Sequence, residues 1–331
     1  MIIKKHSIWV PGLICISSFL FLSFISDKNP PEAEITNGLI YAHLYLPDAD
    51  NGYYRATRFD WSGVINDLEV NGHRYYGQWY EKYSPTINDA IMGPVEAFDP
   101  IGYDEIKPGG SFLKIGVGLV RKFDDLPYNF ATYYPIVNGG EWKTKVKKNE
   151  VKFEQILQGK EYAYDYCKTV KLLKNKPVMV LSHTLKNTGT KTIETSVFDH
   201  NFLVMDKQIT GPGFVVTLPV KPAEQVNPRM QDYAKVQENQ LIFLKDLNKN
   251  NVSFKDLTNG EGASYNLRVE NHHTGAAVKI TGDRPISKLV FWSASETVCP
   301  EPYIKIKVEP GKTFTWSITY EYYNCEITKA P

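Results

Sequence analysis

Cysteine is scarce in this chain of 331 residues, which contains only Cys15, Cys167, Cys299 and Cys325. No Cys-x-x-Cys pair and no zinc-type spacing of cysteine with histidine occurs, so the sequence carries no signature of a zinc site. Three of the cysteines follow the N-terminal apolar run, and an oxidising compartment would allow one disulfide and leave one thiol over. The chain is therefore not built on a disulfide framework, and we expect buried cysteines instead.

An excess of either charge is also missing. Lysine and arginine number 38, aspartate and glutamate number 37, and the formal net charge is +1. No long basic run occurs. A balanced chain of this kind offers no polyanion-binding surface, so we expect no nucleic-acid partner.

Several common catalytic signatures are absent as well. The sequence has no G-x-S-x-G nucleophile elbow and no H-E-x-x-H zinc motif. The stretch GVGLVR (116–121) lacks the third glycine of a dinucleotide loop, and DADNG (48–52) lacks the spacing of a calcium loop. These absences set aside the corresponding hydrolase, dinucleotide-binding and calcium-binding classes.

The N-terminus has the pattern of a targeting segment. Lys4 and Lys5 precede an apolar run over residues 8–25, and polar residues begin at Ser26. This order is typical of a secretory signal, and the run is also about long enough to remain as a membrane anchor. We expect residues 1–26 to be a signal peptide or N-terminal anchor. The folded part is then exported, either periplasmic or membrane-anchored and facing the periplasm.

Long amphipathic helices are missing from the rest of the chain, and strand patterns take their place. Many segments alternate with period two and are rich in Val, Ile, Tyr, Phe and Thr, and turn residues separate them. No Pro- or Ser-rich stretch divides the chain after residue 38. We predict a linker over 27–37, one large antiparallel β-sandwich over 38–325 and a tail over 326–331. The predicted strands lie at 39–46, 112–120, 150–157, 162–173, 178–185, 193–205, 213–220, 239–244, 276–282, 288–294 and 313–323. Residues 76–111 read instead as long loops across the mouth of the sandwich.

Two segments carry residues suited to acid–base chemistry. In DHNF (199–202), His200 interrupts a strand pattern, and a histidine facing a cleft exchanges protons near neutral pH. The alternative is a buried histidine bonded to the backbone. In VCPEPY (298–303), Glu301 stands between two prolines after an apolar strand, where a rigidly held carboxylate suits a general base. The alternative is a surface turn.

These segments resemble a known family. VCPEPYIKIKVEPGKTFTWSITYEY and FDHNFLVMD are similar, in content and order, to segments of the galactose mutarotase (aldose 1-epimerase) superfamily, over roughly residues 34–325. The chain resembles a divergent exported bacterial member. The resemblance implies that Glu301 takes the proton from the anomeric hydroxyl and that His200 protonates the ring oxygen. It also implies that no cofactor or metal is required.

The chain departs from the family pattern at one position. Where the family often carries a second histidine, GVGLVRK (116–122) places Val117, and Arg121 matches an arginine of the sugar-phosphate branch. Other polar residues beside aromatics suit sugar hydroxyls and faces, so the predicted substrate-binding residues are Arg58, Asp60, Glu96, Arg121 and Trp79. The alternatives are a strand-edge ion pair for Arg58 and Asp60, an exposed loop position for Glu96 and a core position for Trp79.

We therefore expect an epimerase that interconverts the anomers of a saccharide or modified sugar. One alternative is a non-catalytic carbohydrate-binding protein on the same fold, which Val117 favours. Another is a polysaccharide lyase or hydrolase, because related sandwiches occur as domains of such enzymes. Hydrolysis by two carboxylates would require a second acid near the first, and Glu96 or Asp60 would have to supply it. Any membrane association would come only through the N-terminal anchor.

Overall fold

The computed structural model describes residues 29–222, 232–258 and 260–328, and this part of the chain is built of antiparallel β-strands. The single helical element among these residues is the short 3-10 turn η1 (Met205–Lys207). No helix in the described part is long and apolar enough to span a membrane. The predicted signal or anchor segment lies outside the described residues. The predicted all-β class is confirmed.

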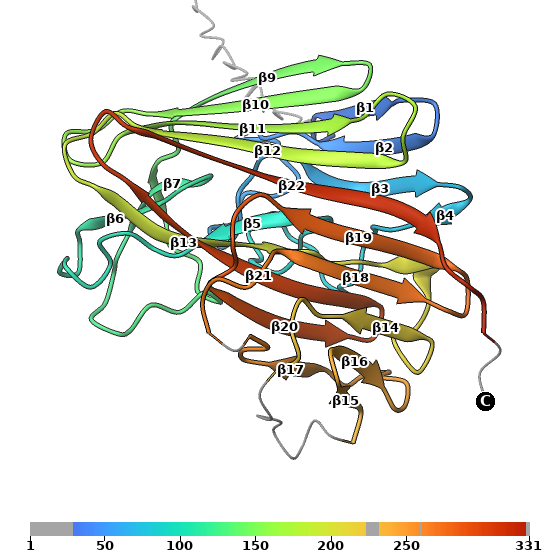
Figure 1. Ribbon diagram of the computed structural model, residues 1–331. Helices are drawn as coiled ribbons and strands as arrows, with labels where there is room; N and C mark the ends of the chain where they lie inside the picture. Colours follow the sequence, from blue (N-terminus) through green and yellow to red (C-terminus); the bar gives the residue numbers. More distant parts are fainter. Residues whose placement is uncertain (1–28, 223–231, 259, 329–331) are drawn as a thin grey trace, which may run out of the picture.

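The largest sheet, called the long sheet below, crosses the whole molecule (Figure 1). Its strands alternate buried and exposed residues because one face is covered and the other faces solvent. In spatial order it contains β15 (Ala234–Gln237), β16 (Gln240–Phe243), β14 (Phe214–Thr217), β18 (Asn266–Asn271), β19 (Ala276–Gly282), β22 (Thr313–Asn324), β12 (Val178–Asn187), β11 (Tyr164–Leu172), β10 (Glu150–Leu157) and β9 (Glu141–Lys147).

A second sheet, called the cavity sheet below, packs against the covered face of the long sheet. Ring contacts join the two, since Phe98 meets Tyr166 at 5.8 Å and Trp316 at 6.2 Å between ring centroids. Packing on both faces explains why its central segments, residues 95–98, 197–200 and 297–302, are buried throughout. In spatial order it contains β17 (Val252–Phe254), β20 (Lys288–Ala294), β21 (Thr297–Val308), β13 (Ile193–His200) and β5 (Val95–Phe98).

Two smaller sheets complete the described fold. One contains β1 (Glu32–Thr36), β2 (Ile40–Tyr45), β3 (Val64–Val70) and β4 (His73–Arg74), and the other β6 (Ser111–Lys114), β7 (Gly118–Arg121) and β8 (Ile136–Asn138). Between β4 and β6 the chain lies in loops apart from β5, in agreement with the loops predicted over 76–111.

Two sequence-based boundaries were wrong. The predicted linker over 27–37 contains β1, because Ala33 and Ile35 alternate with polar residues and are buried against the core. The predicted strand over 112–120 is the hairpin of β6 and β7. Gly116 adopts a φ of 78° in its turn, and an added Cβ there would meet Asp60 Oδ1 at 2.5 Å, so the tight turn depends on glycine.

The predicted C-terminal tail is in part packed onto the fold. The backbone N–H of Thr328 donates to the carbonyl of His272, and a ring nitrogen of His272 lies 2.8 Å from the carbonyl oxygen of Glu326. Cys299 is buried, as expected, and Cys167 and Cys325 are half-buried. All three are free thiols.

Candidate functional site

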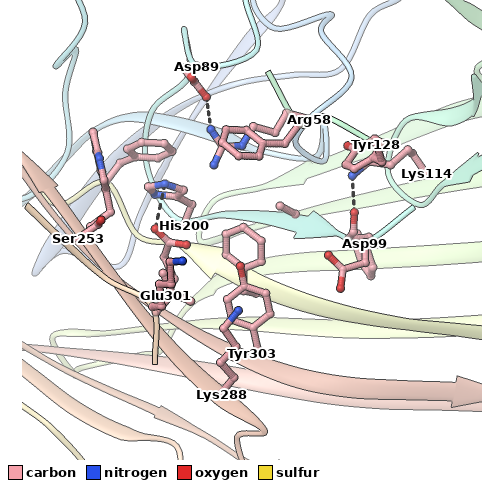
Figure 2. A pocket seen from close by; sticks show the side chains of 18 of the residues that line it. Arg58, Asp89, Asp99, Lys114, Tyr128, His200, Ser253, Lys288, Glu301 and Tyr303 are labelled. Carbon is pink, nitrogen blue, oxygen red and sulfur yellow. Dashed lines mark hydrogen bonds and ion pairs between the residues drawn. The ribbon is translucent and has the colours of Figure 1, made fainter. Parts of the chain in front are cut away.

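Alternate side chains of the cavity sheet point away from the long sheet and border a cavity of about 600 Å³. On β13 these are Phe198 and His200, and on β21 they are Glu301 and Tyr303 (Figure 2). The intervening residue Asp199 faces the long sheet, where the hydroxyl of Tyr320 donates to its carboxylate at 2.9 Å. Strand alternation thus separates the two titratable residues of the DH pair onto opposite faces.

Aromatic rings hold His200 in place. Its ring stacks on Phe202 with centroids 3.8 Å apart and an interplanar angle of 7°. The edges of Phe59 and Trp292 contact it at centroid distances of 5.6 Å and 5.7 Å. Trp79 extends this wall, because it stacks on Phe202 at 4.9 Å and donates its indole N–H to the carbonyl of Ile91. The imidazole therefore has a fixed orientation in an apolar setting.

The central contact of the cavity joins His200 and Glu301. His200 Nε2 lies 3.3 Å from Glu301 Oε1, and both side chains are almost wholly buried (Figure 2). Burial raises the pKa of the Glu301 carboxyl to about 7, opposed by the positive charges of Arg58 and Lys288. Burial, with a contribution from Arg58, lowers the pKa of His200 well below its usual value. Both groups therefore favour their uncharged forms at pH values below about 7.

The backbone around Glu301 is restrained from both sides. Pro300 and Pro302 fix their φ angles next to it within β21. The ladder between β13 and β21 ends at the pair Phe198 and Tyr303, so both prolines fall where β21 pairs only with β20. There the missing N–H groups cost little, and the side-chain amide of Asn201 donates to the Pro300 carbonyl at 2.6 Å. Glu301 is thus a strand residue rather than part of a surface turn.

Loops cover the cavity on the side away from the long sheet. Arg58 lies among them, paired with Asp89, with its guanidinium carbon 4.7 Å from the centre of the Phe59 ring and 4.2 Å from that of Phe130. Trp79, Asp89 and Asp99 come from the 76–111 region, so that region borders the site, as the sequence indicated.

A group of polar side chains lies at the other end of the cavity from His200 (Figure 2). Lys114, at the end of β6, donates to the backbone carbonyl of Phe98 and lies 5.6 Å from the centre of the Tyr128 ring. Burial is the main reason that the pKa of Lys114 falls to about 7, and Asp99 opposes this fall. Burial also raises the pKa of Asp99, while Lys114 and Lys288 act against that rise.

The arrangement of the sheets has counterparts among solved structures. A galactose mutarotase related enzyme from Lactobacillus acidophilus aligns with a TM-score of 0.53 at 14% identity, over 90% of this chain and 100% of that one. The aldose epimerase homologue from C. elegans aligns with a TM-score of 0.53 at 11% identity, over 90% and 100%. This chain has the galactose mutarotase-like fold. Slr1438 from Synechocystis sp. PCC 6803 aligns with a TM-score of 0.55 at 11% identity, over 90% and 97%. The sequence itself matches no protein-family model and no curated protein.

Within this mutarotase-like fold, Arg58, Trp79, His200 and Glu301 are the predicted site residues that line one cavity. Arg58 pairs with Asp89 rather than with Asp60. Arg121 does not line this cavity, and its side chain is exposed on β7. Val117 is buried in the core cluster that also contains Phe112 and does not line the cavity. The position at which the resemblance led us to look for a second histidine therefore lies outside this cavity.

Asp60 and Glu96 are corrected from sugar ligands to members of a buried ionic network between the sheets. Neither borders the cavity, and both are almost fully buried. Glu96 accepts a hydrogen bond from Lys168 and lies 2.6 Å from His183 Nε2, both on the long sheet. Glu96 faces these residues because strand alternation on β5 turns it away from the cavity-lining Ala97.

The network keeps charge deep in the protein. Burial alone would raise the pKa of Glu96, but Lys168 and His183 hold it at about 2. Burial raises the pKa of Asp60 to about 7, even though Lys168 opposes the shift and Tyr166 donates to this carboxyl at 2.8 Å. Burial also lowers the pKa of His183.

The sequence contains a signal for this network. On β11, Lys168 occupies a period-two position between Tyr166 and Val170, and all three are buried. On β12, His183 likewise stands between Leu181 and Leu185. A charged or titratable residue at an apolar position of such a strand indicates a buried polar partner. No such signal marks Lys114, Asp99 or Lys288, which reach the cavity from separate parts of the chain.

Among the described residues, no group of three or more His, Cys, Asp or Glu side chains is arranged to hold a metal ion.

Proposed function

We propose that this protein is a sugar epimerase of the aldose 1-epimerase type, in which Glu301 and His200 exchange protons with the anomeric centre. The observation that carries the proposal is the contact of 3.3 Å between His200 Nε2 and Glu301 Oε1 at the wall of a cavity of about 600 Å³. The mutarotase-like fold supports the assignment of a sugar, and fold alone does not fix the activity.

The reaction requires a base and an acid close together. The base removes the proton of the anomeric hydroxyl, the acid protonates the ring oxygen, and the bond between C1 and the ring oxygen breaks. The carbonyl carbon then presents its other face, and the reverse transfers close the ring as the other anomer. No proton is gained or lost overall, so a pair that holds one proton is sufficient.

The Glu301–His200 pair takes the proposed roles, with Glu301 as the base and His200 as the acid, in one of its two protonation arrangements. A single proton resides either on the Glu301 carboxyl or on the His200 imidazole. When it resides on His200, the carboxylate is the base and the imidazolium is the acid. The apolar surroundings make this arrangement the less populated one, but the two differ only by a proton shift within one contact.

Aromatic walls supply the binding surface for a sugar ring. Trp79 and Trp292 both line the cavity, and their rings pack against each other in a T-shaped contact with centroids 5.3 Å apart, beside the stacked rings of His200 and Phe202. Flat aromatic faces suit the apolar C–H surfaces of a pyranose, and Arg58 offers N–H donors to its hydroxyl groups.

Anomer exchange measured by NMR tests the proposal. The protein without residues 1–26 would be incubated with a panel of neutral sugars, uronic acids and sugar phosphates. We expect faster exchange with at least one class and a loss of about 10²–10⁴-fold in Glu301→Gln, the usual contribution of one acid–base group. Glu321→Gln, at an exposed position of β22, is the matched control and should exchange at the unaltered rate.

Two outcomes would overturn the proposal. Full activity in a folded Glu301→Gln variant would remove the acid–base pair from the mechanism. Tight sugar binding without exchange, by the unmodified protein, would indicate a carbohydrate-binding protein instead. The polysaccharide hydrolase alternative loses its support from Asp60 and Glu96, since neither carboxylate reaches the cavity.

A further inference from the structure

The charges that border the cavity are not balanced. The lining contains four cationic side chains (Arg58, Lys114, Lys255 and Lys288) and three carboxyl groups (Asp89, Asp99 and Glu301). Arg58 is already paired with Asp89, and Glu301 is in contact with His200. The three lysines form no ion pair with any residue that the structure describes, so Asp99 is the one remaining carboxyl group against three lysine side chains, of which Lys255 is exposed to solvent.

Lys114 is the most deeply placed of these lysines. Its side chain is buried with 3% of the residue exposed, yet it lines the cavity. The hydrogen bond to the Phe98 carbonyl uses one of the three N–H donors of an ammonium group. A buried ammonium without a bonded carboxylate is costly, and an anion entering the cavity would remove that cost.

Lys288, the first residue of β20, lines the cavity together with Lys114, His200 and Glu301. Its charge lowers the pKa of both Asp99 and Glu301, which places it within electrostatic reach of both groups. Its ammonium lies 4.8 Å from the centre of the Tyr303 ring, and Tyr303 in turn stacks on Phe198 at 4.3 Å. Figure 2 shows Lys288 on the same side of the cavity as Glu301, with Lys114 and Asp99 beyond it.

We propose that the ligand of this cavity is an acidic sugar, whose carboxylate, phosphate or sulfate group binds to Lys114 and Lys288 while its anomeric centre faces Glu301 and His200. The sugar part rests on the proposed function, whereas the anion part rests on the unpaired lysines. Such a ligand would replace the missing counter-charge at one end of the cavity and leave the acid–base pair free at the other.

Calorimetric titration tests the anion part without relying on turnover. The probes are a hexuronate, a hexose phosphate and a hexose sulfate, each compared with the neutral hexose of the same configuration. At least one acidic probe should bind more tightly than its neutral counterpart, and the probe that does so identifies the anionic group. Equal affinity for acidic and neutral probes would overturn the inference.

Two lysine variants locate the anion. Lys114→Met and Lys288→Met should each reduce the ratio of acidic to neutral affinity by on the order of tenfold to a hundredfold, the usual effect of losing a charge-assisted hydrogen bond. Lys145→Met, at an exposed position of β9, is the matched control and should leave the ratio unchanged. An unchanged ratio in both cavity variants would exclude this subsite, and the second variant preserves the test if the first fails to fold.

Proton uptake gives an independent readout. The pKa of Lys114 is about 7, because burial and Arg58 lower it more than Asp99 raises it, so the free amine is largely uncharged at about pH 8. Binding of an anion should recharge it, so titrations in buffers with different ionisation enthalpies should reveal proton uptake in the unmodified protein and less in Lys114→Met. Anomer exchange with neutral sugars but no preference for anions would reject this inference and keep the proposed function. Binding of acidic probes without anomer exchange would support this inference and reject the proposed function.

Discussion

At the scale of single residues, burial decides how the cavity behaves. Glu301 and His200 are ordinary titratable groups whose charged forms are disfavoured by the aromatic surroundings. Their chemical roles could be predicted from DHNF and VCPEPY, but their electrostatic state could not. That state depends on Phe59, Phe202 and Trp292, which the fold brings around the imidazole from distant segments.

The pH dependence of exchange follows from this burial. Because the pKa of Glu301 is raised to about 7, the pair retains its proton below that pH and loses it above. His200 takes up a second proton only at distinctly acidic pH, since its own pKa is lowered. Anomer exchange should therefore stay level through mildly acidic pH and fall as the pH rises through about 7. A rate that instead increases through the same range would mean that the carboxylate alone is the active form.

At the scale of elements, the buried network joins the cavity sheet to the long sheet. Lys168 on β11 and Glu96 on β5 carry opposite charges across the inter-sheet layer. Removing one partner of a buried pair leaves the other charge uncompensated, which typically costs about 3–5 kcal/mol. This interaction stabilises β5 next to β13, and β13 carries His200.

Urea unfolding of paired variants tests the network. Lys168→Met should lower the free energy of unfolding by about 3–5 kcal/mol, and the double variant Lys168→Met/Glu96→Gln should regain much of that loss because no uncompensated carboxylate remains. Lys171→Met is the control on the same strand, where surface exposure limits the effect to about 0.5 kcal/mol. A double variant as unstable as the single one would show that the pairing of the two charges does not matter.

The elements also show where sequence patterns suffice. Strands such as β10, β19 and β20 were predicted with their observed limits, because one covered face gives a clear period of two. The hairpin of β6 and β7 was read as one strand, since its turn residues 115–117 include two apolar side chains that are buried. Tertiary packing rather than local polarity ends β6.

At the scale of the whole molecule, the cavity is assembled from segments between Arg58 and Tyr303. The sequence predicted the sandwich and its two central site residues because both lie on regular strands. It could not predict Lys114, Asp99 or Lys288 as neighbours, because their proximity depends on how loops and a separate small sheet lie over the cavity sheet.

The first strand provides a test at this scale. β1 pairs with β2, and the N–H of Thr36 at its end donates to the carbonyl of Lys148, so the segment is part of the fold rather than a linker. A chain that begins at Gly38 should lose about 2–3 kcal/mol of stability relative to one that begins at Asn29, the value of burying one large aliphatic side chain such as Ile35. Equal urea midpoints for the two chains would restore the linker interpretation.

The alternation of side chains between the two faces of β13 limits which mutations this strand can accept. Phe198 and His200 face the cavity while Asp199 faces the network, so one strand supplies both. Insertion or deletion of a single residue before His200 would exchange the two faces, placing an aspartate against the aromatic rings and an imidazole among the buried charges. Both sites would fail in one event. Variation in this strand is therefore restricted to substitution, whereas the loops that carry Arg58, Trp79 and Asp99 can also change in length.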